Sequence, residues 1–179
     1  MLTAIDLFSG AGGFGVPNGI YPCWCVQDHV PKDLHNQPAT LYSTIGGSLP
    51  GDVAGLPWAK INYVLNNKIR VPGETNLKFF EDVQTAIWKL LGGDPNPDFG
   101  VDANAQKMIN QGNAHPSFIP DVDDVVAVIV WSNPLKHIQR SICEMKPPQY
   151  IVNKATASGK SGSQVVQSNQ VSATVSQTF

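Results

Sequence analysis

The chain has 179 residues, a formal net charge of −2 and only 15% charged residues. This length is enough for one domain with a hydrophobic core and a short extension. Because the 12 lysines and arginines form no basic patch, the composition argues against nucleic acid as the main partner. No run of 18 apolar residues occurs in the sequence, so we expect no membrane span.

The first residues are predicted to form a strand over 2–8 and a glycine turn over 9–13. From Asp6 to Phe14 they resemble the first motif of the cytosine-5 DNA methyltransferases, whose glycines let the backbone approach S-adenosylmethionine. That loop should open a helix, but Val-Pro-Asn-Gly at 16–19 blocks one. The other motifs of that family have no counterpart. An S-adenosylmethionine-binding methyltransferase-like fragment is therefore kept as the alternative function.

The same residues show no signal peptide, since they lack a basic segment and Asp6 interrupts the apolar run. This leaves two expectations open. Either the protein is cytosolic, or the numbering starts after a removed leader.

Further strands are predicted over 20–27, 38–45, 125–131 and 138–145, and we expect the apolar run at 125–131 to be central and buried. In the first of these, Cys23 and Cys25 are two residues apart and share a face, with Trp24 on the other. The only other cysteine is Cys143, so at most one disulfide can form. Either Cys23 or Cys25 could bond Cys143.

Three helices are predicted over 58–67, 81–91 and 102–111. Gly92 and Gly93 are expected to end the second helix, Asp102 to cap the third, and Gly112 to stop it. With the strands, these helices predict an α+β fold in which a mainly antiparallel sheet carries the three helices and is followed by a C-terminal extension strand.

One polar residue of the second predicted helix lies next to its apolar face. Val83 and Ile87 belong to its apolar stripe, and Gln84 lies beside that stripe, one turn before Trp88. A buried amide needs hydrogen-bond partners. Asp82 lies near the start of the helix, where the helix dipole favours negative charge.

The C-terminal part is predicted to leave the domain. We expect a domain over 1–148, a flexible linker over 149–163 and a terminal strand over 164–179. This strand has no hairpin partner evident in the sequence. It could fold back on its own sheet or add to the sheet of the next copy, and we favour the second, which generates a homopolymeric filament.

Four motifs follow one another in the order known from one family. They are Trp24-Cys25-Val26, the pattern Trp58-x-x-Ile61-Asn62-Tyr63-x-Leu65-Asn66, the stretch Asp82-Val83-Gln84-x-Ala86-Ile87-Trp88, and Phe118-Ile119-Pro120 followed by the strand at 125–129. Over about 14–146 these resemble secreted domains related to the Cys–Gln thioester domains of Gram-positive surface adhesins. Two departures are Cys23, where the family tends to have glycine, and Gln27, where aspartate is usual.

The resemblance implies an extracellular or cell-surface protein. Cys25 and Gln84 would form an internal thioester, with Cys23 as the backup cysteine and Trp24, Trp88 and Asp82 as supporting residues. Such a bond captures one amine or hydroxyl of a surface ligand without turnover, so we expect no enzyme. The plainer alternative is a buried structural thiol at Cys25.

We expect no cofactor and no metal. The four histidines, at 29, 35, 115 and 137, lack the spacing of metal ligands. Three aspartates at 121, 123 and 124 could hold calcium, but a solvated acidic turn before a strand accounts for them as well.

Overall fold

The computed structural model divides the chain into two units, Met1–Lys146 and Pro147–Phe179, which are described separately. In the first unit the structure describes residues 13–16, 19–27, 39–46, 48–93, 100–131 and 140–146, and in the second it describes strands only. The predicted strand at 2–8, most of the glycine turn, and the histidines at 29, 35 and 137 lie outside the described residues.

The first unit contains a five-stranded sheet in which every described pairing is antiparallel. Its strand order is β1-β2-β5-β4-β3. The strands are β1 (Gly13–Val16), β2 (Gly19–Cys25), β3 (Thr40–Ser43), β4 (Val126–Trp131) and β5 (Ser141–Met145). The apolar strand β4 is buried and has a neighbour on each side, but the middle position belongs to β5.

A short 3-10 helix and three α-helices complete the unit: η1 (Gly51–Val53), α1 (Trp58–Asn66), α2 (Asn76–Leu90) and α3 (Ala103–Ala114). The prediction placed the start of α2 at residue 81, five residues too late. The helix starts earlier because the Thr75 hydroxyl accepts the N–H of Lys78 at 3.1 Å, which is an N-cap. Asp102 caps α3 as expected, through the N–H groups of Asn104 and Ala105.

The prediction that Gly112 stops α3 is wrong, because the helix continues through Ala114. Gly112 is there for packing. A Cβ at this position would lie 2.8 Å from a methyl carbon of Leu90 and 3.1 Å from one of Val64. The missing side chain therefore lets α3 approach α2 and α1 closely.

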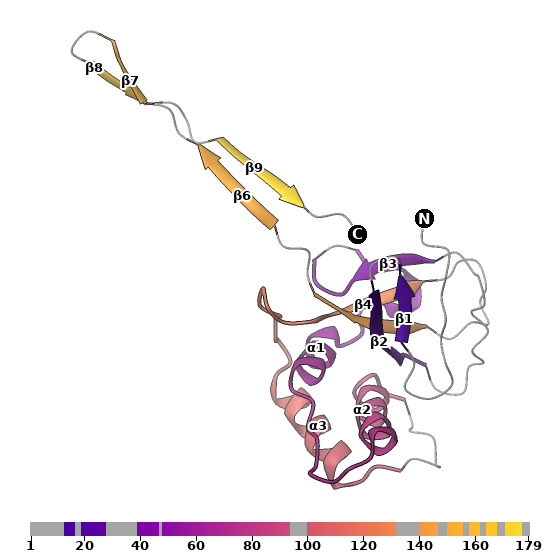
Figure 1. Ribbon diagram of the computed structural model, residues 1–179. Coiled ribbons are helices and arrows are strands. Elements are labelled where there is room, and N and C mark those ends of the chain that lie inside the picture. The colour runs from indigo at the N-terminus through magenta and orange to yellow at the C-terminus, as the bar shows by residue number, and fades with distance from the viewer. Residues whose placement is uncertain are drawn as a thin grey trace. The chain divides into compact units, whose positions relative to one another are not determined.

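The core lies between the helices and one face of the sheet (Figure 1). On that face, alternate strand residues pack against the helices, among them Trp24, Ile129 and Ile142. Cys23 and Cys143 belong to a smaller cluster on the opposite face. The α+β fold class is thus confirmed, as is the expectation that Cys23 and Trp24 lie on opposite faces of β2.

The second unit differs from the prediction of a linker followed by a lone strand. It contains β6 (Tyr150–Ala155), β7 (Ser158–Ser161), β8 (Gln164–Gln167) and β9 (Val171–Ser176). β6 pairs with β9 and β7 with β8, both antiparallel. Aromatic and β-branched residues at 150–152 favour a strand, which the linker assignment overlooked. The terminal strand β9 has a partner in its own chain. The lack of a hairpin partner therefore no longer supports donation of this strand to another copy.

Candidate functional site

Strand β2 extends beyond its neighbour β1. The pairing of β1 covers β2 only from Gly19 to Pro22, whereas β5 pairs with β2 from Cys23 to Cys25. The N–H of Val26 donates to Arg140 on the β5 side, at 2.8 Å. Since backbone groups alternate along a strand, the N–H and C=O of Cys25 point away from β5. They lie on the same edge of β2 as β1, but beyond the point where the pairing with β1 ends.

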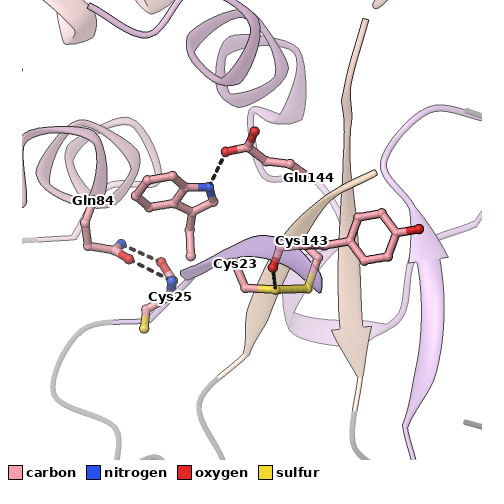
Figure 2. The surroundings of a disulfide bond; sticks show 7 residues. Cys23, Cys25, Gln84, Cys143 and Glu144 are labelled. Carbon is pink, nitrogen blue, oxygen red and sulfur yellow. Dashed lines mark hydrogen bonds between the residues drawn. A yellow bond between two sulfur atoms is a disulfide. The ribbon is translucent and has the colours of Figure 1, made fainter. Parts of the chain in front are cut away.

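Gln84 occupies that side. The Cys25 N–H donates to Gln84 Oε1 at 2.8 Å, and Gln84 Nε2 donates to the Cys25 carbonyl oxygen at 2.9 Å (Figure 2). Both residues are buried, with Gln84 only 2% exposed. Helix α2 fixes the amide because the flanking Val83 and Ile87 are fully buried in the core. We call this arrangement the Gln84 clamp.

The structure thus brings Cys25 and Gln84 together through the cysteine backbone. In Figure 2 the Cys25 sulfur points away from the Gln84 amide. Thioester formation would require the thiol to turn towards the amide carbon. The bond itself stays a prediction.

The disulfide of the structure joins Cys23 and Cys143. The two residues lie directly opposite each other in the pairing of β2 with β5, with Cα atoms 4.1 Å apart. Cys25 instead lies opposite Ser141. A bond from Cys25 to Cys143 would be diagonal, and diagonal pairs lie about 7–8 Å apart, beyond the reach of most disulfides. The structure therefore leaves Cys25 outside the disulfide.

Trp24 anchors β2 next to this site. Its indole N–H donates to Glu144 at 2.7 Å, and its ring stacks on Phe80 of α2, with centroids 4.8 Å apart. Glu144 also pairs with Lys68. Sequence reasoning missed Glu144. The available signal was a carboxylate between apolar residues of a strand, which needs partners when buried.

Asp82 ties α2 to the start of α3. The prediction that it lies near the start of its helix is wrong, because α2 begins at Asn76 and its first turn holds no acidic residue. It is buried, accepts a hydrogen bond from Asn104 Nδ2 at 2.9 Å, and pairs with Lys78, which also pairs with Asp102. Burial disfavours the charged form of Asp102, but the Lys78 contact and the N–H of Ala105 outweigh it, so the pKa of Asp102 lies below its usual value. The remaining supporting residue, Trp88, is buried in α2 one turn after Gln84.

A second clamp, which the sequence did not reveal, holds α1 to β4. The Val125 N–H donates to Asn66 Oδ1 and Asn66 Nδ2 donates to the Val125 carbonyl oxygen, both at 2.8 Å. One turn earlier, Asn62 Oδ1 accepts the N–H of Ala127 at 2.8 Å. The available signal was two asparagines four residues apart along the buried side of a helix.

None of the helices in the described part of the chain has the length and apolar character that crossing a bilayer requires. Within the same residues, no cluster of three or more His, Cys, Asp or Glu side chains suits a metal ion. The acidic turn closes on itself, since Asp124 accepts the N–H of Asp121 at 2.9 Å.

Comparison with protein-family models and with curated proteins gives no match. Among solved structures, the fold is similar to the N-terminal thioester domain of a surface protein from Clostridium perfringens, in a cysteine-to-alanine variant. The TM-score is 0.50 at 11% sequence identity, over 82% of this chain and 98% of that one. At this identity the similarity establishes the fold alone. The resemblance predicted from the sequence is confirmed at that level.

The methyltransferase alternative finds no such support. Most of its motif lies outside the described residues, but Gly13 and Phe14 belong to strand β1, where that family would begin a helix. The described sheet is antiparallel throughout.

Proposed function

We propose that this chain is an adhesin-like surface protein whose Cys25 and Gln84 form an internal thioester for a single covalent capture. One observation carries the proposal: two hydrogen bonds hold the Gln84 amide on the backbone of Cys25, at 2.8 and 2.9 Å.

Thioester formation would start from this clamp. With the thiol turned towards the amide, Cys25 Sγ attacks the Gln84 carbonyl carbon, and the amide nitrogen leaves as ammonia with the thiol proton. Because both groups belong to one folded site, the step is effectively unimolecular. The Cys25 N–H already donates to Gln84 Oε1 at 2.8 Å, the distance range of an oxyanion-hole donor. The same donor that clamps the amide would therefore stabilise the tetrahedral intermediate.

Capture would be the reverse type of acyl transfer, with a partner amine or hydroxyl in place of ammonia. A partner amine or hydroxyl attacks the Gln84 carbonyl carbon, the bond to Cys25 Sγ breaks, and the thiol is regenerated with a proton from the nucleophile. The new amide or ester keeps the partner attached. The thioester is consumed in the process, so the protein acts once and is not an enzyme in the usual sense. Burial of Gln84 keeps water from competing.

An extracellular or cell-surface location belongs to the proposal. The Cys23–Cys143 disulfide fits an oxidising compartment. The fold neighbour is a domain of a surface protein, which supports the same location by likeness of fold.

Intact mass spectrometry of the freshly purified chain tests the thioester. We expect a mass about 17 Da below that of the sequence with its disulfide, since one ammonia is lost on acylation of the thiol. Methylamine should add to this species, and Cys25→Ala should abolish both effects. Gln84→Glu is the matched control, because it keeps the shape of the side chain but offers no amide. A full mass together with no methylamine adduct would disprove the proposal.

Self-association into a filament is a separate part of the proposal. In the described strands of the second unit, β6 pairs with β9 alone, and a two-stranded ribbon leaves one edge of each strand open to another copy. Sedimentation and electron microscopy of the full chain and of a chain ending at Lys146 test this. Filaments formed only by the full chain would support it. A full chain that stays monomeric at high concentration would end it.

A further inference from the structure

A cavity of about 410 Å³ is lined by residues that follow Cys25 and Gln84, the two members of the Gln84 clamp, along the chain. Val26 and Gln27, which directly follow Cys25, line one part of it. Leu91 lines another and lies seven residues after Gln84, about 10 Å further along the helix axis and on the same side. The cavity therefore begins directly after Cys25 along the chain and reaches the C-terminal end of α2, the helix that carries Gln84.

The cavity wall is mixed. Val26, Val53, Leu56 and Leu91 supply its apolar part, and Gln27, Arg140 and Asp52 contribute polar side chains. Ligand sites are commonly built in this way, with apolar walls for the body of the ligand and a few fixed polar groups for its orientation. The charged pair decides which ligand fits.

Arg140 is fixed and buried, whereas Asp52, one of the groups that it contacts, is exposed. The guanidinium lies 3.7 Å from the centre of the Trp131 ring, and the side chain is 10% exposed. Arg140 Nε is 3.6 Å from an oxygen of Asp52, whose side chain is 49% exposed. An exposed partner at this distance adds little and can be exchanged. A stacked guanidinium, in contrast, remains planar and oriented for a carboxylate.

We infer that this cavity binds a carboxylate of the captured partner, so that the thioester reacts preferentially with amines that carry a carboxylate several bonds away. A lysine flanked by an acidic residue has this chemistry. The inference rests on the proposed function. In the capture step the amine nitrogen bonds to the Gln84 carbonyl carbon and Cys25 Sγ leaves with a proton from the amine. The carboxylate is unchanged and takes the place of Asp52 beside Arg140.

Three six-carbon amines that differ only at the far end test the preference: 6-aminohexanoate, 6-aminohexanamide and 1,6-diaminohexane. The rate of adduct formation on the full chain is followed by intact mass at one pH and one concentration. We expect the carboxylate to react about tenfold faster than the amide, the usual gain of one charge-assisted hydrogen bond. Equal rates, or a fastest reaction with the diamine, would overturn the inference.

Single substitutions test whether Arg140 causes the difference between the carboxylate and amide rates. Arg140→Gln should bring the ratio of the carboxylate and amide rates to about one, since it removes the guanidinium. Asp52→Asn should raise that ratio, because it removes a carboxylate that competes for Arg140, and it decides the question if Arg140→Gln does not fold. Arg70→Gln is the matched control, because Arg70 is exposed over Phe79 and lines neither the cavity nor the clamp. It should leave the ratio unchanged.

A binding measurement separates this inference from the thioester itself. Hexanoate has no amine and cannot be captured, but it offers the same carboxylate and chain. We expect hexanoate to raise the melting temperature of the full chain more than hexanamide does, and Arg140→Gln to cancel the difference. No difference between the two ligands would refute the carboxylate site even if methylamine shows the thioester to be present. A clear difference in melting temperature without any methylamine adduct would support the carboxylate site and rule out the capture reaction.

Discussion

The Gln84 and Asn66 clamps are the same device applied to different residues. In each, a helix amide accepts the N–H of one residue and donates to its carbonyl oxygen, at 2.8–2.9 Å. Cys25 is the last residue of β2, and Val125 directly precedes β4. Gln84 holds Cys25, and Asn66 holds Val125. Since the clamp works on a valine, it does not require a thiol. What distinguishes the Gln84 clamp is that a reactive side chain has been placed on the residue that the amide already contacts.

Both clamps have the same structural origin. β3 pairs with β4 only from Val128 onwards, so the residues before it are left to Asn66, Asn62 and Thr44, just as β1 leaves Cys25 to Gln84. Buried backbone groups need partners. A helix amide supplies them where a neighbouring strand has ended.

The largest expected effect in this comparison belongs to Gln84→Ala. It leaves the N–H and C=O of Cys25 buried without their partner and opens a cavity, so we expect a loss of about 3–5 kcal/mol in the free energy of unfolding. Urea denaturation followed by circular dichroism measures it. A loss no greater than that of an exposed helix position would show that the clamp does not hold α2 to β2.

Asn66→Ala should cost less, about 1–3 kcal/mol in the same measurement, because Asn66 is only half-buried and water can reach part of the site. Asn67→Ala is the control one residue along. Asn67 is exposed and its amide bonds only to Tyr63 of its own helix among the described contacts. If the two variants lose the same stability, the contact with Val125 contributes nothing of its own.

Cys25→Ala compares the two clamps most directly. It removes the thiol, so that the Gln84 clamp resembles the Asn66 clamp. The hydrogen bonds go to the backbone and should persist, so we expect a loss of only about 1 kcal/mol, from the missing sulfur. Reaction with methylamine should disappear entirely. Nuclear magnetic resonance detects the clamp in this variant through slow hydrogen exchange of the backbone N–H at position 25. Fast exchange there would mean that the thiol, and not the backbone contact, maintains the clamp.

The sequence predicted the parts of this site that depend on local pattern. The spacing of Cys23 and Cys25 predicts a shared face, and the position of Gln84 beside an apolar stripe predicts a buried amide. It did not predict that the amide would meet the cysteine backbone, because that depends on where β1 ends. Asn66 belongs to one of the four family motifs, but its contact with Val125 was not predicted, nor was that of Glu144 with Trp24. These partners are 59 and 120 residues away and become neighbours only through tertiary packing.

The smallest expected effect is a loss of stability at low pH, and it should act on α2, the helix that carries Gln84. Asp102 and Asp82 share Lys78, which links the start of α3 to α2. The pKa of Asp102 is lowered in the folded state, so its contribution to stability is present above the ordinary value of 3.8 and is lost as the pH falls through the lowered value. Because the side chains of Lys78 and Asp102 are 41% and 38% exposed, we expect a loss below about 1 kcal/mol.

Asp102→Asn keeps a capping oxygen for the N–H groups of Asn104 and Ala105 but removes the titrating charge. Urea denaturation of both proteins at pH 7 and pH 3 should show a smaller loss on acidification in the variant. At pH 3 the exchange protection of the Cys25 N–H should also fall more than that of the Val125 N–H, since only the first depends on a clamp from α2. Equal falls at the two sites would mean that the Lys78 network stabilises the whole domain and has no particular effect on the Gln84 clamp.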